Sequence, residues 1–271
     1  MVATAVLTPL FVLAGLVAVV ALMPPKIAIV VAIAAIVGTS MVLRERRATG
    51  PARELSVAEA PQLHAVLERL CLLADLPKPA LVVEPERQPN SWIVGTGGDR
   101  YRLHLTEGLL ERLAPHELEA VIGHELAHVA NRDAAVMTVV GGPAAALLGG
   151  GLRIARGGWW LAMGGGLVAA GIGWLASLGT RVLSRYREFA ADAGSVALTG
   201  SAAALASALT KVSEGIVAIP SRDLRAVAAR DAFHLLPVAR EDRFHLPATH
   251  PSLQARIARL EKLERALHAR R

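Results

Sequence analysis

The segment Val121-Ile-Gly-His-Glu-Leu-Ala-His-Val-Ala130 is the stretch around which this chain is organised. It places His124 and His128 four residues apart, with Glu125 directly after the first histidine. On a helix, residues four apart lie on one face, so both imidazoles can reach the same ion. Glu125 lies about 100° further round the helix, where it can contact a metal-bound water instead of the metal. The segment therefore predicts a metal site with a carboxylate base beside it.

The residues around this motif are typical of an amphipathic helix. Pro115 suits a first helical turn, where its missing N–H is not needed. An apolar stripe surrounds the histidines and comprises Leu118, Val121, Ile122, Leu126 and Val129. The alternative is a chance match on a buried helix. With only 9 histidines in 271 residues an accidental H-E-x-x-H is rare, so we favour the metal site.

Composition places the chain among membrane proteins. Hydrophobic residues make up 53% of the sequence and charged residues 19%, and the mean hydropathy is +0.43. Such a chain is too apolar for an ordinary soluble domain. The net charge of +6 could indicate nucleic acid, but no nucleic-acid motif is present, and a membrane surface fits better. The single cysteine, Cys71, excludes an internal disulfide.

Two apolar runs open the chain, at residues 2–23 and 27–43. At about 1.5 Å per residue the first is long enough to cross a bilayer core of roughly 30 Å. A cleaved signal peptide is the alternative, but its basic start is missing. We predict a transmembrane hairpin over residues 1–43. Four arginines follow it (Arg44, Arg46, Arg47, Arg53), and the positive-inside rule then places the next segment in the cytoplasm.

Residues 44–133 are predicted to fold as soluble structure. Ser56 and Glu59 form a capping box that predicts a helix ending near Leu76, before Pro77. Three short β-type runs follow, at Ala80–Glu84, Ser91–Val94 and Tyr101–Leu105. A small sheet beside the metal helix can hold a peptide extended along an exposed edge strand.

Two further uncharged runs follow the metal helix, at Ala134–Leu152 and Gly157–Thr180. The alternative to membrane spans is a helical hairpin buried inside a soluble domain. The lengths of the runs favour spans, and their many glycines and alanines permit close helix packing. We therefore predict a second transmembrane hairpin over residues 134–180, inserted between two parts of one cytosolic domain, 44–133 and 181–271.

A third metal ligand is predicted after the second hairpin. Glu188 and Asp192 are four residues apart, so they share one helix face. A hydrolytic zinc site usually has three protein ligands and keeps one position for water. His128 and Glu188 lie about 9 and 12 Å from the two ends of the hairpin, which brings them to similar heights and makes Glu188 the candidate. The alternative is a solvated carboxylate beside Arg185 and Arg187.

Two aspartates are predicted to orient the ligand histidines. Asp133 follows the metal helix, and Asp192 lies one helical turn beyond Glu188. A ligand histidine usually donates its other ring N–H to a carboxylate, which sets its tautomer. Asp133 and Asp192 suit this role.

The C-terminal sequence predicts two more helices, over residues 201–215 and from about Ser252 to His268. A covering loop over residues 219–248 separates them, and we interpret His234 and His245 in this loop as surface or packing histidines. The last helix has one apolar face and one basic face, which is either solvated or rests on anionic lipid headgroups. The fold class predicted for the chain is therefore mainly α with a small β-sheet.

Three motifs stand in order along the chain. They are His124-Glu-Leu-Ala-His-Val-Ala-Asn-Arg-Asp133, then Ser184-Arg-Tyr-Arg-Glu-Phe-Ala-Ala-Asp-Ala-Gly194, then Thr249-His-Pro251 with Arg256. Together they resemble the HtpX-type membrane zinc endopeptidases, which are relatives of the CAAX prenyl endopeptidases. The resemblance covers most of the chain, including both pairs of hydrophobic segments. Asn90, within Pro89-Asn90, is similar to a family signature on a strand near the cleft, although this chain continues with Ser91-Trp92 where the family commonly has small or Phe-like residues.

The resemblance implies a multi-span membrane protein carrying a gluzincin-like zinc-protease domain. It implies an endopeptidase of the bacterial cytoplasmic membrane, with its active site facing the cytoplasm, that acts in quality control of membrane or misfolded proteins. One Zn²⁺ per chain would be held by His124, His128 and Glu188, with Glu125 as catalytic base. The expected partners are protein substrates and the lipid bilayer, without nucleic acid.

The resemblance also implies that His250 and Arg256 contact the substrate or the oxyanion. Pro251 suits the first turn of the last helix, so His250 would stand at a rigid helix entrance and could donate to the oxyanion. Arg256 lies more than one turn deeper, which points either to a different contact or to a supporting role behind the metal ligands. The alternatives are a helix-capping His250 with Arg256 paired to an acid, or His250 occupying the open position of zinc in a resting enzyme.

Two other classes of function are alternatives to peptide-bond hydrolysis. A zinc-binding scaffold or chaperone without turnover would share the metal ligands, but it would have no need of Glu125. A transporter with a regulatory zinc site would need polar residues within its spans, and the four apolar runs contain almost none. We therefore favour the zinc endopeptidase.

Overall fold

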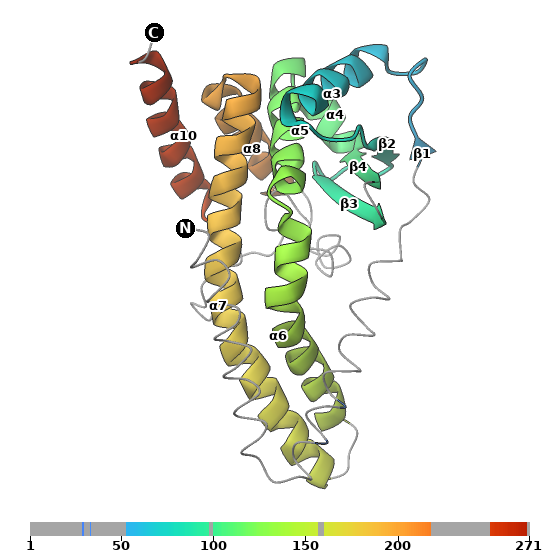
Figure 1. Cartoon of the computed structure of the whole chain (residues 1–271), viewed down its shortest axis with the longest axis vertical. Helices are drawn as coiled ribbons and strands as arrows, with labels where there is room; N and C mark the ends of the chain where they lie inside the picture. The colour runs from blue at the N-terminus through green and yellow to red at the C-terminus, as the bar shows by residue number, and fades with distance from the viewer. Residues whose placement is uncertain are drawn as a thin grey trace. The chain divides into compact units, whose positions relative to one another are not determined.

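The structure is a computed structural model that describes residues 53–97, 100–156, 160–217 and 250–269, with Ile29 and Ile33 as isolated positions. Within these ranges the fold is mainly helical with one small mixed sheet, which confirms the predicted combination of helices and a small β-sheet (Figure 1). Apart from the two isolated isoleucines, the hairpin predicted over residues 1–43 lies outside the described residues. The loop predicted over residues 219–248, with His234 and His245, lies outside them as well.

The sheet has four strands in the order β1-β2-β4-β3. Their bounds are Arg53–Glu54 for β1, Ala80–Glu84 for β2, Ser91–Gly97 for β3 and Arg100–Thr106 for β4. The β2 and β4 strands are parallel, whereas β1 pairs antiparallel with β2 and β3 pairs antiparallel with β4. The three predicted strands are therefore confirmed. Among the described strands, β3 is an edge strand, as is the unpredicted β1.

The first helix begins later than the sequence predicts. The Glu59 carboxylate does accept hydrogen bonds from the Ser56 backbone N–H, at 2.9 Å, and from its hydroxyl, at 2.7 Å. These bonds close a turn, whereas helix α3 spans Pro61–Ala74. Proline lacks a backbone N–H and fits a first helical turn, so Pro61 sets the start of α3. Its end lies at Asp75, which has a left-handed φ of 51°.

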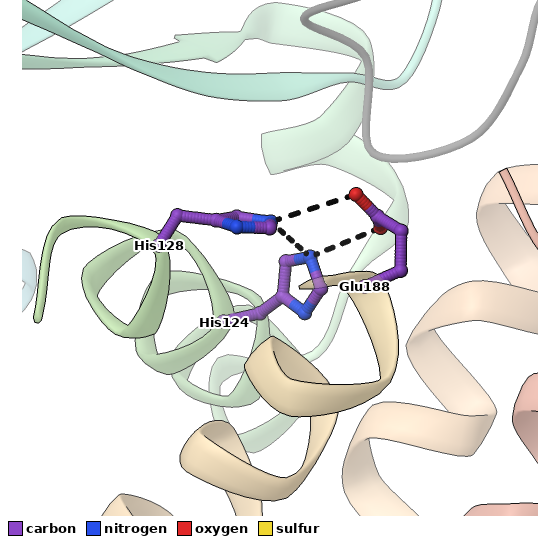
Figure 2. A group of neighbouring side chains, drawn as sticks. All are labelled: His124, His128 and Glu188. Carbon is purple, nitrogen blue, oxygen red and sulfur yellow. Dashed lines mark hydrogen bonds and ion pairs between the residues drawn. The ribbon is translucent and has the colours of Figure 1, made fainter. Parts of the chain in front are cut away.

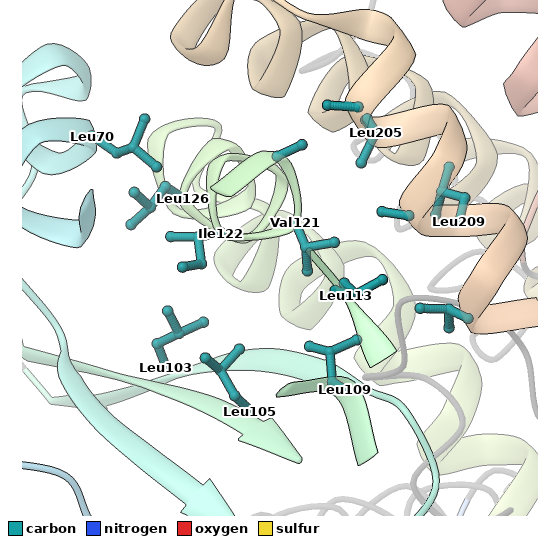
Figure 3. Close-up of a cluster of buried hydrophobic side chains, with 14 of the residues drawn as sticks. Leu70, Leu103, Leu105, Leu109, Leu113, Val121, Ile122, Leu126, Leu205 and Leu209 are labelled. Carbon is teal, nitrogen blue, oxygen red and sulfur yellow. The ribbon is translucent and has the colours of Figure 1, made fainter. Parts of the chain in front are cut away.

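Helix α5, Pro115–Ala130, runs through the centre of the hydrophobic core. It contacts the sheet, α3 and α8 (Ala202–Val217), as Figure 3 shows in part. Leucine, valine and isoleucine side chains of α5, of these elements, of the short α4 (Glu107–Arg112) and of Leu113 after it are buried together (Leu70, Leu103, Leu105, Leu109, Leu113, Val121, Ile122, Leu126, Leu205, Leu209). Each such side chain contributes about 1.5–3 kcal/mol when fully buried. The helix that carries both histidines is thus held firmly on several sides.

The last helix, α10, spans Leu253–His268 and packs against α8. Leu260 is buried at this contact. The Glu264 carboxylate accepts hydrogen bonds from the backbone N–H groups of Ala202 and Ala203, at 2.8 and 3.2 Å. A carboxylate at a helix N-terminus satisfies donors that have no partner within the helix. The start of α8 is therefore fixed by α10.

The described residues form two compact units, one of residues 135–183 and one of residues 53–134 with 184–269. Helices α6, Asp133–Ala155, and α7, Trp160–Thr199, contribute to both.

Within the first unit, α6 and α7 approach each other through glycines. A Cβ atom on Gly151 would lie 2.5 Å from the backbone N of Ala170, and one on Gly166 would lie 2.6 Å from the backbone N of Ala155. Only glycine permits such close backbones, and membrane helices commonly pack in this way.

The outer faces of these two helices are apolar and exposed. Examples are Val139, Leu167 and Leu175, whose side chains are 70%, 55% and 62% exposed. Both helices are long and apolar enough to cross a membrane. A core helix of a soluble protein can have the same length and composition, and part of each helix is buried, as at Leu147 and Ala169.

Candidate metal centre

Three side chains from two helices converge in the sheet-containing unit (Figure 2). His124 and His128 extend from α5, and their Nε2 atoms lie 3.1 Å apart. Glu188 extends from α7, with Oε2 3.7 Å from Nε2 of His124 and Oε1 3.8 Å from Nε2 of His128. Four ligand atoms arranged tetrahedrally around zinc at about 2.0–2.1 Å would be roughly 3.3 Å apart. The observed spacing fits such an ion.

A close crossing of α5 and α7 brings Glu188 to the histidines. A Cβ atom on Gly194 would lie 2.6 Å from Cβ of Ala127, so the crossing requires glycine there. The Ser195 hydroxyl donates to the Ala120 carbonyl at 2.6 Å and fixes the two helices at this point. Glu188 lies two turns before Ser195 on the same helix face, which directs its carboxylate at the histidine pair.

The histidine tautomers follow from the carboxylates behind them. Nδ1 of His124 lies 3.1 Å from Oδ1 of Asp192, and Nδ1 of His128 lies 2.5 Å from Oδ2 of Asp133. An ionised carboxylate only accepts, so the Nδ1 atom that faces it is the one that carries a proton, and when the ring is neutral its lone pair is on Nε2. Two lone pairs 3.1 Å apart repel each other unless a cation or a proton lies between them. This donor set therefore fits a metal, and Asp133 and Asp192 lie where the sequence predicts.

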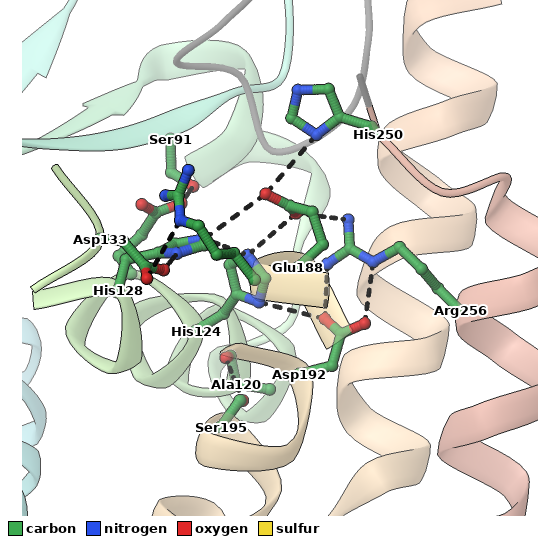
Figure 4. Close-up of polar contacts among 12 residues, drawn as sticks. Ser91, Ala120, His124, His128, Asp133, Glu188, Asp192, Ser195, His250 and Arg256 are labelled. Atoms are coloured by element: carbon green, nitrogen blue, oxygen red, sulfur yellow. Dashed lines mark hydrogen bonds and ion pairs between the residues drawn. The ribbon is translucent and has the colours of Figure 1, made fainter. Parts of the chain in front are cut away.

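Arg256 stands behind Asp192 (Figure 4). Its Nε and Nη2 donate to the two Asp192 oxygens at 2.9 and 2.6 Å, and its Nη1 lies 3.5 Å from Oε2 of Glu188. The Arg256 side chain is 0% exposed. This geometry matches the alternative in which Arg256 pairs with an acid. Its contact with the substrate or the oxyanion stays a prediction.

Arg187 forms an ion pair with Asp133, and sequence reasoning missed it. Its Nε lies 3.0 Å from Oδ1 of Asp133. The sequence places Arg187 only as a charged neighbour of Glu188. No periodic pattern links it to Asp133, because the two residues belong to different helices. The structure thus contains two histidine–aspartate–arginine chains, one for each histidine.

The charges around the site leave room for a divalent cation. Burial opposes ionisation of Glu188, but its contact with His250 and the charge of Arg256 hold its pKa below the usual range. Arg256 likewise outweighs burial and lowers the pKa of Asp192. The site contains four carboxylates (Glu125, Asp133, Glu188, Asp192) and two guanidinium groups (Arg187, Arg256). With neutral histidines, the formal charge of these six groups is minus two. A bound dication would neutralise this charge.

The pKa of His128 also indicates that the site favours a positive charge. Burial disfavours its charged form, yet the hydrogen bond with Asp133 and the charges of Glu188 and Glu125 raise its pKa above the ordinary 6.5. Oε2 of Glu188 has no hydrogen-bond partner within the described part of the chain. Both observations are expected where a metal ion supplies the missing positive charge.

The predicted base, Glu125, is buried beside the ligands. Its side chain is 4% exposed, and its Oε1 accepts a hydrogen bond from the Ser91 hydroxyl at 2.7 Å. Asn90, the residue expected on a strand near the cleft, directly precedes β3 and is 2% exposed. Its backbone N–H donates to Oγ1 of Thr106 at 2.9 Å, and its carbonyl accepts from the Thr106 N–H at 3.1 Å. The start of β3 is therefore fixed next to Glu125.

His250 approaches the same site from the entrance of α10. Its Nδ1 lies 3.6 Å from Oε1 of Glu188, and the residue is 5% exposed. The Ser252 hydroxyl caps α10 by accepting from the Ala255 N–H at 3.2 Å. The structure thus brings His250 to the ligand cluster, while its role as an oxyanion donor stays a prediction.

Comparison with known proteins extends this description. The sequence model of Peptidase family M48 matches residues 57–264. The chain is 42% identical over 238 residues to "Protease HtpX homolog" of Moorella thermoacetica, covering 81% of this chain and 78% of the relative. It is 39% identical over 267 residues to "Protease HtpX homolog 1" of Streptomyces coelicolor, covering 92% and 87%. Both relatives match over most of their length.

A solved structure shares the fold. Ste24p of S. mikatae aligns with a TM-score of 0.52 at 16% sequence identity. The alignment covers 78% of this chain and 52% of that chain, about half its length. At this identity the likeness concerns the fold alone.

Proposed function

The chain belongs to peptidase family M48 and is a metalloprotease, and from this premise we propose that it is a zinc endopeptidase of the bacterial cytoplasmic membrane that cleaves membrane or misfolded proteins. One observation carries the proposal. Ligand atoms of His124, His128 and Glu188 lie within 4.8 Å of one another, and Glu125 follows His124 directly on the same helix.

His124, His128 and Glu188 would hold the ion. Two histidines and one glutamate are a ligand set of catalytic zinc sites, which leave a fourth position open. When bound there, zinc would polarise a water molecule and the carbonyl of the scissile peptide. Asp192 and Asp133 support this set by keeping the Nε2 lone pair of each imidazole free.

Glu125 is the proposed general base. Its carboxylate would take the proton of the attacking water and pass it to the leaving amine. His250 would donate a hydrogen bond to the developing oxyanion from the rigid entrance of α10. Arg256 is proposed to act by holding Asp192 and Glu188 in place, because its guanidinium is fully buried against them.

The substrate would bind as an extended peptide along β3. This strand stands at an edge of the described sheet, and its first residue, Ser91, contacts Glu125. A peptide that adds to a sheet edge gains backbone hydrogen bonds without regard to its sequence. Such binding suits an enzyme that cleaves many unfolded or misfolded proteins. Asn90 is proposed to belong to this substrate-contacting strand.

We propose a membrane arrangement with two hairpins and one cytosolic domain. Residues 1–43 and 134–180 would form the hairpins, and residues 44–133 with 181–271 would form the protease domain on the cytoplasmic side. The exposed apolar faces of α6 and α7 support the second hairpin. The arginines after residue 43 support the cytoplasmic side by the positive-inside rule.

A zinc-binding scaffold without turnover is the alternative that shares these ligands. The buried position of Glu125 and its hydrogen bond with Ser91 speak against it. A scaffold would gain nothing from a carboxylate that binds no metal and has almost no contact with solvent, since burying such a group costs free energy.

The test compares the zinc-loaded full chain with Glu125→Gln on an unfolded membrane protein. Glu125→Gln removes a base but no metal ligand, so it should retain zinc and lose cleavage. Substantial cleavage by Glu125→Gln, or loss of its zinc, would contradict the proposed role of Glu125. Absence of zinc-dependent cleavage by the unaltered chain would overturn the proposed function itself.

A further inference from the structure

Ser91 is a buried polar residue whose hydroxyl contacts the proposed base. Its side chain is 0% exposed, and its hydroxyl donates to Oε1 of Glu125 at 2.7 Å, across 34 positions of sequence. The hydrogen bond joins β3 to α5, the strand proposed to bind substrate and the helix that carries the base.

The position of Ser91 is set by the sheet. It pairs with Leu105 across the antiparallel β3–β4 ladder, and directly opposed residues extend to the same face. Leu105 is part of the hydrophobic core that contains α5, so the Ser91 side chain faces α5 too. Asn90, immediately before it, is fixed by two backbone hydrogen bonds with Thr106. Ser91 therefore has little freedom to move away from Glu125.

The Glu125 carboxylate depends on this hydrogen bond for its position more than Ser91 does. Its helix is rigid, but a glutamate carboxylate can rotate about three side-chain bonds. A hydrogen bond to Oε1 stops this rotation and leaves Oε2 as the oxygen that can meet a water molecule. A proton acceptor must lie within hydrogen-bond reach of the proton that it takes, and a misplacement of about 1 Å can cost 10²-fold in rate.

We infer that Ser91 is a positioning residue that orients the Glu125 carboxylate. The same hydrogen bond fixes β3, the strand proposed to bind substrate, relative to the catalytic base. The inference rests on the proposed function, because it assigns Ser91 a part in the same hydrolysis. Ser91 touches neither the metal ligands nor the reacting bond in this role. It acts through Glu125.

The experiment uses Ser91→Ala in the full chain, with Ser207→Ala as a matched control. Ser207 also donates a hydroxyl to a glutamate of α5, Glu117, at 2.6 Å, but near the start of that helix. Each change removes one serine–carboxylate hydrogen bond from α5. Ser91→Thr keeps a hydroxyl at the position and tests for rescue.

Ser91→Ala should lower kcat by about 10- to 100-fold, the scale of a hydrogen bond to a charged group that orients a catalytic side chain. KM should stay within about twofold, and one zinc per chain should be retained, because the lost hydroxyl binds neither substrate nor metal. Ser207→Ala should leave kcat within about twofold. Ser91→Thr should recover most of the loss.

A second measurement does not depend on turnover. In the Glu125→Gln background, Ser91→Ala should leave the Kd of a fluorescent peptide substrate within about twofold. A large rise in that Kd would make Ser91 a substrate-binding residue and overturn the inference.

The other outcomes separate the inference from the function on which it rests. An unchanged kcat in folded, zinc-loaded Ser91→Ala would overturn the inference alone, provided that the unaltered chain cleaves and Glu125→Gln does not. A loss of kcat that only follows loss of zinc or of thermal stability would also overturn it. If the unaltered chain shows no zinc-dependent cleavage, both the function and the inference fail.

Discussion

Arg256 binds Asp192 through two parallel hydrogen bonds of 2.9 and 2.6 Å, although the two residues lie 64 positions apart in the sequence. Asp192 in turn lies 3.1 Å from Nδ1 of His124. A residue on α10 thus controls the orientation of a ligand on α5 through a carboxylate on α7. The zinc affinity of this site should therefore depend on a helix that supplies no ligand.

Arg256→Ala should destabilise the protein and weaken zinc binding together. It leaves Asp192 and Glu188 buried without their guanidinium, and loss of one member of a buried ion pair typically costs about 3–5 kcal/mol. Zinc affinity should fall by about 10- to 100-fold, as for other partners of ligand histidines. Arg256→Lys should recover part of both losses, because an ammonium group cannot make the two parallel bonds. Thermal unfolding and chelator competition measure the two effects.

Arg259→Ala is the control for that prediction. Arg259 lies on the same helix, with its Cζ 4.9 Å from the centroid of the Phe189 ring, and it forms no ion pair with Asp192 or Glu188 in the described part of the chain. Its removal should cost no more than about 1 kcal/mol and leave zinc affinity unchanged. Equal losses in both variants would mean that α10 acts only by general packing.

The three proposed ligands should each be needed for zinc retention. His124→Ala, His128→Ala and Glu188→Ala should lose most of the bound zinc, measured by metal analysis after dialysis. His116→Ala should keep it, because His116 is exposed near the start of α5 and distant in the helix from the ligand pair. Full zinc occupancy in Glu188→Ala would point to another third ligand, with Asp192 the first to test.

Zinc binding should weaken as the pH falls through the raised pKa of His128. Its carboxylate neighbours raise this pKa above 6.5 in the metal-free site. A ligand histidine must be neutral to bind zinc. Protons therefore compete with zinc for His128 at pH values below this pKa, and this competition disappears at pH values far above it. The lowered pKa of Glu188 keeps its carboxylate ionised over this range, so the histidine sets the limit.

Asp133→Asn should shift this pH limit downward. It removes a hydrogen bond and a charge that both raise the pKa of His128, so protons compete with zinc only at lower pH. Chelator competition between pH 5 and 9, a range of about two units either side of an ordinary histidine pKa, measures the midpoint. Glu119→Gln, which changes a carboxylate of α5 paired with Arg69 at the surface, should leave the midpoint in place. An upward shift in Asp133→Asn would contradict the assigned cause.

His250→Phe should keep the fold and the zinc but lower kcat by roughly 10²–10³, the usual effect of removing one oxyanion donor. Steady-state kinetics on zinc-loaded protein would measure it. An unchanged kcat would refute the catalytic role. A gain in activity would instead favour His250 as a ligand of the resting enzyme.

Cysteine labelling in intact cells tests the proposed orientation. Val57→Cys, at an exposed position of the protease domain, should react with a membrane-impermeant maleimide only after permeabilisation. Arg156→Cys, between the two spans of the second hairpin, should react in intact cells. The native Cys71 should contribute little, because burial raises its pKa to about 11 and leaves little reactive thiolate. Labelling of position 57 without permeabilisation would reverse the orientation.

The sequence by itself determined the features that depend on local geometry. A spacing of four residues on a helix brings His124 and His128 onto one face, whatever surrounds that helix. Pro115 marks the first turn of α5, and alternation and turn residues locate the three predicted strands. The same periodicity directs Glu188 and Asp192 to a common face. These relationships span a few residues, so the backbone alone sets them.

Only the tertiary structure decided the contacts that hold these side chains in place. Arg256 with Asp192, Arg187 with Asp133, and Ser91 with Glu125 join separate elements, and no periodicity in the sequence relates their positions. Which residues meet there depends on how closely α5 and α7 cross and where β3 ends. Core packing sets both, because Gly194 admits Ala127 and the buried leucines hold α5 against the sheet. Even the bond between Ser56 and Glu59, which the sequence predicted, closes a turn instead of opening a helix, since Pro61 sets where α3 begins.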